Sequence, residues 1–175
     1  MPFTALVHSD EGFTLSGLEG EQVSFKSRFR DSNSEGSLKP ATIRDCVGCH
    51  ILVDCPVSLL NIYNARDTTV VASGVKGSIH LFRCESTSVS GFSRQLRISD
   101  SYDIEVHVQT SSSTALANSV SVRIGAPPSS DSIPGCQEAL STLSMSSEEY
   151  TSSNSWMNVK DFNCLVPDSP NWSFL

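Results

Sequence analysis

The middle of the chain, from residue 41 to about 125, alternates short aliphatic and β-branched runs with single polar residues. A longer pattern overlies the alternation. An aliphatic residue opens a segment, a small residue follows three places later, and a second aliphatic residue falls eight places after the first. Four segments keep all three features and the fifth opens on threonine; they start at Ile43, Ile62, Leu81, Ile98 and Thr114. Alternation with a period of two is typical of strands that bury one face.

The small residues of these segments recur at intervals of 19, 19, 17 and 16 residues. They are Cys46, Ala65, Cys84, Ser101 and Ala117. An interval of this length that holds strands and turns but no helix indicates one coil of a parallel β-helix. Successive coils lie ~4.8 Å apart, the spacing of strands in a sheet. Side chains at equivalent positions therefore stack, and a tight corner accepts only small residues in its column.

An antiparallel β-sandwich would also show short strands and frequent turns. The spans between the segments lack the Asn-Gly or Asp-Gly pairs that would fold each strand back on its neighbour. The pattern therefore favours an all-β, parallel β-helix over residues 11–128. We expect an N-terminal extension at 1–10, and a Ser-rich loop with an aromatic docking segment, partly helical, at 129–175.

The chain length, the net charge and the absence of targeting motifs limit the classes of partner and the location that we expect. The 175 residues suit a single domain, and the net charge of −7 argues against binding a phosphate backbone, so nucleic acid is not an expected partner. The chain begins without a signal-peptide pattern and holds no apolar run long enough to span a bilayer. Pro2 and the C-terminal residues match no lipidation motif. We expect a cytoplasmic protein without a lipid anchor.

The stretch "DCVGCH" at 45–50 contains C-x-x-C-H, the spacing of covalent haem attachment. Haem attachment belongs to exported proteins, and Cys46, Cys49 and His50 lie too close together to complete a four-ligand zinc site. Buried cysteine also behaves as a small hydrophobic residue. We therefore assign Cys46 to the corner column and expect no metal site.

The stretch "QLRIS" at 95–99 places two polar residues on one face of a strand. If Leu96 and Ile98 fill the coil, Gln95 and Arg97 both project outward, because successive strand side chains point to opposite faces. The stack of coils places His80 below Arg97 and Thr114 near or above it.

Four stretches carry a family resemblance: "RQLRIS" at 94–99, "VRIGAPP" at 122–128, "WMNVKDFNCL" at 156–165 and the terminal "SPNWSFL". Together with "EGFTLSGLEGE" at 11–21 they make residues 11–175 resemble the C-terminal domain of tubulin-folding cofactor C. That domain is shared with a retinitis-pigmentosa protein that activates Arf-like small GTPases. The resemblance implies a right-handed parallel β-helix that accelerates GTP hydrolysis by a bound GTPase.

In this family a catalytic arginine lies in the Q-x-R element, which implies Arg97 as the arginine and Gln95 as its companion. Family members often carry a second glutamine at the position that Arg94 occupies here, so Arg94, with His80, is expected at the partner contact. The resemblance also implies that the domain performs no chemistry of its own and needs no cofactor, because GTP and Mg²⁺ would belong to the partner. His8, His50, His80 and His107 show no spacing typical of a hydrolytic triad.

The resemblance leaves three functions open. The first is activation of tubulin GTP hydrolysis during tubulin folding, in concert with other tubulin-folding cofactors. The second is activation of, or binding to, an Arf-like small GTPase. The third is a non-catalytic cytoskeletal binding module, like the actin-binding domain of cyclase-associated proteins. A location at the cytoskeleton or basal body would fit any of them. In the last 20 residues or so we expect Trp156, Asp161, Phe162 and Trp172 to dock the C-terminal segment on the β-helix.

Overall fold

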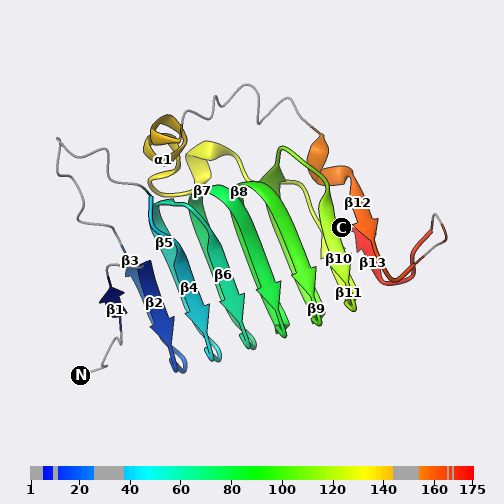
Figure 1. The fold of residues 1–175 in the computed structure, drawn as a ribbon, viewed down its shortest axis with the longest axis horizontal. Coiled ribbons are helices and arrows are strands. Elements are labelled where there is room, and N and C mark those ends of the chain that lie inside the picture. The colour runs from blue at the N-terminus through cyan, green and yellow to red at the C-terminus, as the bar shows by residue number, and fades with distance from the viewer. Residues whose placement is uncertain (1–5, 10–11, 26–37, 144–153, 165, 167) are drawn as a thin grey trace.

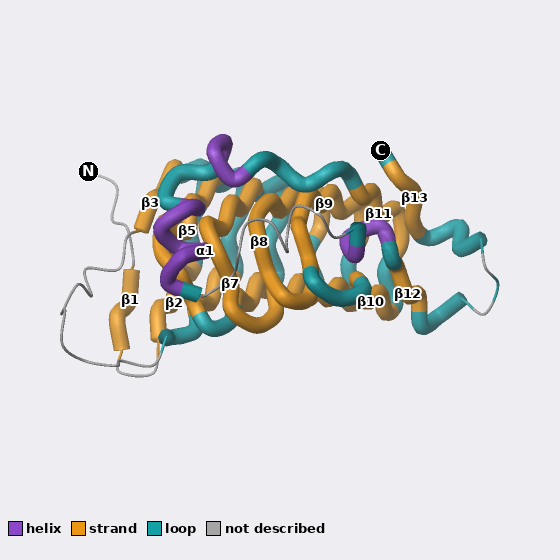
Figure 2. Tube along the Cα trace, turned by 90° about the horizontal axis from the view of Figure 1, so that it is seen from above, coloured by secondary structure: helices purple, strands orange, loops and turns teal. Residues whose placement is uncertain are grey.

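The computed structural model describes residues 6–9, 12–25, 38–143, 154–164, 166 and 168–175. Strands of successive coils stack side by side along one axis to form a solenoid (Figures 1 and 2). The strands are β1 (Leu6–Ser9), β2 (Gly12–Ser16), β3 (Gln22–Phe25), β4 (Ala41–Arg44), β5 (His50–Val57), β6 (Leu60–Tyr63), β7 (Thr69–Phe82), β8 (Glu85–Ser99), β9 (Tyr102–Thr110), β10 (Thr114–Ala117), β11 (Val120–Ile124), β12 (Val159–Asp161) and β13 (Trp172–Phe174). The prediction of a parallel β-helix is confirmed.

The stacked strands form two faces. The first sheet holds β2, β4, β6, the second halves of β7 and β8, β10 and β12. The second sheet holds β3, β5, the first halves of β7 and β8, β9, β11 and β13. All of these pairs are parallel, whereas β1 pairs antiparallel with β2. Because β7 and β8 run without a break through both sheets, they tie the two faces together at mid-length.

The interior is filled by aliphatic rows that run along the solenoid axis. The first sheet contributes Leu15, Ile43, Ile62, Leu81, Ile98 and Leu116, which are register partners in adjacent coils and are all buried. The second sheet contributes Val23, Ile51, Val70, Val89, Val106 and Ile124 in the same way. Each such side chain gains about 1.5–3 kcal/mol from burial. A single coil cannot supply both walls of this core, so the coils stabilise one another.

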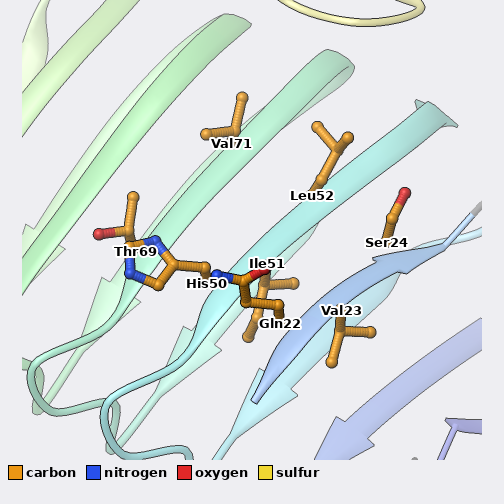
Figure 3. Close-up of a pocket in the computed structure, with 8 residues that line it drawn as sticks. All are labelled: Gln22, Val23, Ser24, His50, Ile51, Leu52, Thr69 and Val71. Atoms are coloured by element: carbon orange, nitrogen blue, oxygen red, sulfur yellow. The ribbon is translucent and has the colours of Figure 1, made fainter. Parts of the chain in front are cut away.

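The second sheet carries an open pocket of about 400 Å³ on its outer face, over β3, β5 and β7 (Figure 3). Outward side chains of these strands form its walls, with Leu52 and Val71 as the apolar part. The backbone at Val23 and Ile51 forms its floor, because both side chains point into the core.

Each coil turns from the first sheet to the second through two left-handed residues three positions apart. The pairs are Gly17 and Gly20, Asp45 and Gly48, Asn64 and Asp67, Arg83 and Ser86, Asp100 and Asp103, and Asn118 and Ser121. Glycine, asparagine and aspartate tolerate this backbone region best, which explains their enrichment at these places. The stretch "DCVG" in "DCVGCH" is one such turn.

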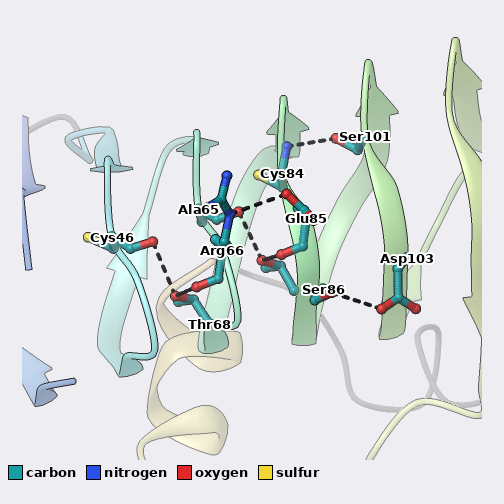
Figure 4. Close-up of polar contacts among 10 residues, drawn as sticks. Cys46, Ala65, Arg66, Thr68, Cys84, Glu85, Ser86, Ser101 and Asp103 are labelled. Atoms are coloured by element: carbon teal, nitrogen blue, oxygen red, sulfur yellow. Dashed lines mark hydrogen bonds and ion pairs between the residues drawn. The ribbon is translucent and has the colours of Figure 1, made fainter. Parts of the chain in front are cut away.

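Buried small residues follow the left-handed positions, and their side chains bond to the turn itself (Figure 4). In each case a thiol or hydroxyl donates to the carbonyl oxygen two residues earlier. The pairs are Cys46 to Arg44, Cys49 to Val47, Thr68 to Arg66, Thr87 to Glu85, Ser101 to Ser99 and Ser119 to Ala117. Cysteine, serine and threonine are therefore interchangeable here as small residues that carry one short donor. Cys46 and Cys49 serve in two such columns.

The corner column was predicted correctly through Ser101 and wrongly beyond it. Ser119, not Ala117, is the next member, because its hydroxyl accepts a bond from the Ser101 amide at 3.2 Å. Ala117 pairs with Ser99 and lies half-buried on the outer face. The true fifth segment opens on Leu116, which pairs with Ile98, and ends on Ile124. A shift of two residues keeps the same face inward, so alternation alone could not reveal the error.

The described elements after residue 129 lie on one side and at one end of the solenoid. Helix α1 (Cys136–Thr142) packs on β5 and β7, where the helix residues Cys136 and Leu140 join Phe92 in a small second core. The short 3₁₀ helices η1 (Ser130–Ser132) and η2 (Ser155–Met157) flank this region in sequence. Strands β12 and β13 then extend the two sheets by one strand each. Among the described helices, none has the length and apolarity to cross a membrane.

Candidate functional site

The second half of β8 presents the predicted pair of polar side chains on the outer face of the first sheet. Leu96 and Ile98 are each 1% exposed and fill the core. Gln95 is half-buried and Arg97 is exposed, as the alternation requires. The outward position of the Q-x-R residues, predicted from the sequence, is confirmed.

Gln95 holds the side chain of Arg97. The Arg97 Nε donates to the Gln95 Oε1 at 3.1 Å, and the Ser78 hydroxyl donates to the same oxygen at 3.4 Å. Because the amide is neutral, it orients the guanidinium without cancelling its charge. The two Nη groups, which form the outer fork of the guanidinium, have no other partner among the described residues.

Arg97 also differs from Arg66 and Arg123 in its electrostatics. Arg66 pairs with Glu85 at 3.2 Å, and Arg123 pairs with Asp103 at 3.1 Å. Within the described ranges, no carboxylate lies at ion-pair distance from Arg97. An anion that approached Arg97 would therefore not have to displace an internal carboxylate.

His80 lies beside Arg97, as predicted: the two residues are register partners on β7 and β8. The His80 Nε2 lies 2.8 Å from the Ser99 hydroxyl. Burial, and then the charge of Arg97, lower the pKa of His80 below its ordinary 6.5. His80 is consequently neutral at physiological pH, and Arg97 alone carries positive charge in this pair.

Two further residues named from the sequence, Thr114 and Arg94, lie near Arg97 but not on its face. Ala115, not Thr114, pairs with Arg97 on the next coil, because Thr114 points inward and is 1% exposed. Arg94 lies at a corner, where the register between β7 and β8 shifts after Val75. Its side chain is exposed, and its carbonyl oxygen accepts bonds from Ser111 and Ser112. Arg94 therefore borders the face of Arg97 rather than lying on it.

Phe162 is a residue of this face whose role the sequence reasoning missed. We expected it to dock the C-terminal segment, as Trp156 and Trp172 do by packing on the core. Phe162 instead is 69% exposed. It follows Lys160 and Asp161 of β12, which pair with Ala115 and Leu116, so it lies two strands beyond β8. The alternation along "KDFN" could have indicated this, because Phe162 lies two residues after Lys160, so the two side chains point to the same face.

The neighbours of Phe162 fix it in place. Asp161 accepts bonds from the Ser169 hydroxyl and the Asn171 amide, and Asn163 exchanges two bonds with Asn118. Burial alone would raise the pKa of Asp161, but its bonds to Ser169, Asn171 and the Asn163 amide outweigh burial and lower it. Phe162 is thus held outward by a bonded turn.

Taken together, these observations give Arg97 a guanidinium that Gln95 orients and that no carboxylate of the described residues neutralises, on the outer face of the first sheet. The pocket over β3, β5 and β7 is on the other sheet and includes none of these residues. Arg97 stands on a sheet surface rather than in that hollow, an arrangement suited to insertion into a site on another molecule.

Comparison with known proteins identifies relatives. The sequence model of a family described as "Tubulin binding cofactor C" matches residues 38–162. No curated protein sequence matches. Among solved structures, the tubulin binding cofactor C of Leishmania major is similar, with a TM-score of 0.60 and 17% sequence identity. The match covers 74% of this chain and 84% of that one.

Proposed function

Because the chain belongs to the tubulin binding cofactor C family, we propose that it is a tubulin-folding cofactor that stimulates GTP hydrolysis by tubulin. The observation that carries the proposal is Arg97: exposed, oriented by Gln95, and without a carboxylate partner in the described chain. In this proposal Arg97 enters the nucleotide site of tubulin and acts there as an arginine finger.

The chemistry of GTP hydrolysis explains what an added arginine would contribute. Negative charge spreads over the γ-phosphoryl and leaving oxygens in the transition state, so a cation placed there stabilises the transition state more than the bound substrate. A guanidinium remains charged at any physiological pH and its planar fork meets two oxygens at once. An arginine supplied in trans raises the rate by roughly 10³ to 10⁵. Tubulin would supply the GTP, the Mg²⁺ and the attacking water.

Gln95 is a positioning residue in this proposal. With Nε bonded to Gln95, the outer fork of Arg97 remains for the phosphate oxygens. Fixing the side chain before contact reduces the rotamer entropy that is lost on insertion. Gln95→Ala should therefore weaken stimulation less than Arg97→Ala does.

The test is single-turnover GTP hydrolysis by tubulin in the presence of the other tubulin-folding cofactors. We expect the parent protein to accelerate hydrolysis and Arg97→Ala to lose about 10³-fold or more of that acceleration. Arg97→Lys should restore little, because an ammonium group lacks the fork. Arg66→Ala, which removes a surface arginine already paired with Glu85, is the matched control and should behave as the parent. Full stimulation by Arg97→Ala would refute the mechanism.

The same geometry is compatible with an Arf-like small GTPase as the client, because the guanidinium addresses features that GTP has in every GTPase. A panel of Arf-like GTPases, assayed with parent and Arg97→Ala proteins, separates the clients. Stimulation confined to the panel would reassign the client, and no stimulation anywhere would favour the non-catalytic binding module.

A further inference from the structure

Three aromatic rings lie together on the first sheet, next to Arg97. They belong to Tyr63 on β6 and to His80 and Phe82 on β7. Tyr63 meets His80 and Phe82 edge to face, with ring centroids 6.4 and 6.1 Å apart, and His80 lies 6.2 Å from Phe82. We refer to these three residues as the aromatic patch.

The core of the solenoid does not require the patch. Its residues occupy outward positions, between the inward Ile62, Ile79 and Leu81 that fill the interior. Each patch residue is half-buried, and its ring contacts the other two. In the described chain, β6 packs broadly only against its strand neighbours β4 and β7. As far as the structure describes the chain, the outer side of the patch is therefore available to another molecule.

Polar groups at the rim of the patch suit a protein surface. In the part of the chain that the structure describes, the Tyr63 hydroxyl has no hydrogen-bond partner, so it remains able to bond to an incoming group. The Arg83 guanidinium lies 4.8 Å from the centre of the Phe82 ring and shields that edge. Tyrosine with an apolar body and a polar tip is enriched at binding hot spots, as is arginine.

Distance connects the patch to Arg97. His80 on β7 is the register partner of Arg97 on β8, and Tyr63 lies on β6, the next strand of the sheet beyond β7. Since strands are ~4.8 Å apart, the whole patch lies within about 10 Å of the Arg97 strand. A typical protein partner covers about 800 Å², a region roughly 30 Å across. A protein whose nucleotide site received Arg97 would therefore also reach the patch.

The strands on the two sides of Arg97 differ. On the opposite side, Ala115 and Ala117 are the next outward residues and each presents only a methyl group, and the exposed ring of Phe162 follows one strand further away. The strand directly beside Arg97 carries apolar side chains of some size only on the aromatic side, where His80 and Phe82 lie. The face combines an affinity region with a separate cation.

We infer that Tyr63, His80 and Phe82 form the docking surface for an apolar segment of GTP-bound tubulin that borders its nucleotide site. The inference rests on the proposed function, and it divides the work: the patch sets affinity and Arg97 sets rate. An interaction made equally before and in the transition state changes the concentration needed for activity and leaves the maximal rate unchanged.

The experiment titrates the full chain into tubulin with the other folding cofactors and measures GTP hydrolysis. Tyr63→Thr and Phe82→Thr keep a strand-forming residue and remove the ring. We expect each to raise the half-maximal concentration about tenfold, and the double variant more, with the maximal rate within about twofold of the parent. Tyr102→Thr, which removes a 54% exposed ring from β9, is the matched control and should change neither value.

A second arm measures binding directly, with Arg97→Ala protein and tubulin loaded with a non-hydrolysable GTP analogue. Loss of affinity in the patch variants supports the inference even if Arg97 proves not to be catalytic. Thermal unfolding checks that each variant folds, and Phe82→Leu, which keeps apolar bulk, should bind better than Phe82→Thr. Unchanged binding by the folded patch variants, or a lower maximal rate at unchanged half-maximal concentration, would overturn the inference. If the parent protein does not bind tubulin, the inference and the proposed client both fail; binding without stimulation sinks only the proposed function.

Discussion

Exchanging the roles of Ser119 and Ala117 tests the corner column directly. The Ser119 hydroxyl donates to the Ala117 carbonyl at 2.9 Å and accepts from the Ser101 amide at 3.2 Å, and Ser119 is 3% exposed. Ser119→Ala removes both bonds. The Ala117→Ser variant places a hydroxyl on the half-buried outer face instead, where solvent can satisfy it.

The magnitude follows from what the first variant leaves behind. In the described chain, the Ser101 amide donates to no group other than the Ser119 hydroxyl. Ser119→Ala therefore leaves this buried N–H without an acceptor. An unsatisfied buried donor costs about 1–3 kcal/mol. For a chain of this size, 1 kcal/mol lowers the unfolding midpoint by about 2–4 °C. We therefore expect Ser119→Ala to unfold about 2–12 °C below the parent, and Ala117→Ser to unfold within about 1–2 °C of it.

Calorimetry or circular dichroism at a fixed scan rate provides the comparison, with a urea titration to confirm that both variants unfold with the parent's slope. Ser119→Cys is the rescue variant, because Cys46 makes the equivalent bond to its own turn at 3.3 Å. Two outcomes would refute the column as described: equal midpoints for Ser119→Ala and the parent, or a larger loss from Ala117→Ser than from Ser119→Ala.

Three further predictions concern groups with shifted pKa values. Because the pKa of His80 is lowered from 6.5 in the folded protein, the unfolded chain binds this proton more tightly, and stability is full above pH 6.5 and falls below it. In urea titrations, His80→Asn should therefore lose less stability than the parent between pH 7.5 and pH 5.5. An equal loss in the two proteins would contradict this expectation. Burial raises the pKa of the Cys46 and Cys84 thiols, and that of Cys136 to about 11. Iodoacetamide at pH 8 should therefore modify the half-buried Cys164 first, as followed by mass spectrometry. Rapid labelling of Cys46 in the folded protein would be the opposite result. The pKa of Asp161 is lowered, so the stabilising effect of its carboxylate is present above pH 3.8 and is lost as the pH falls further. At pH 7, Asp161→Asn should lower the unfolding midpoint by about 2–4 °C and shift the tryptophan fluorescence. An unchanged midpoint would show that the turn does not need the carboxylate.

The sequence was sufficient to predict the coil because stacking repeats the same demands at each level. The aliphatic rows and the small corner residues from Cys46 to Ser101 occupy their predicted places. The last turn was misplaced because Ala117 and Ser119 are both small and both follow the alternation. The left-handed pair Asn118 and Ser121 distinguishes them, since each turn has its first left-handed residue immediately before the column member. Asparagine before Ser119 was the readable sign.

The first coil escaped the repeat search for a different reason. Leu15 and Leu18 occupy the same rows as Ile43 and Cys46, yet the interval between Leu15 and Ile43 far exceeds that of the other coils. The longer segment of sequence between β3 and β4 destroys the period, yet β2 and β4 still pair in register. The two turn glycines of the first coil, Gly17 and Gly20, matched the three-residue spacing of the other turns.

The candidate site was predictable only in part. Alternation placed Arg97 and Gln95 outward, and the coil interval placed His80 beside them. The bond between Arg97 and Gln95 could not be foreseen, because it depends on rotamers rather than on backbone position. The exposure of Phe162 depends on a strand pairing between β10 and β12, whose separation in sequence no local pattern reports.

The uninterrupted strands β7 and β8 have a consequence for how the protein opens. A stack of coils loosens from its ends, where each coil has only one neighbour, and its middle opens last. Arg97 belongs to β8, which has a neighbour on both sides in both sheets. Amide exchange should therefore be slowest around β7 and β8 and faster toward β2 and β13. Arg97 thus lies on the part of the solenoid that opens most slowly, so local unfolding at either end leaves the position and orientation of its side chain unchanged.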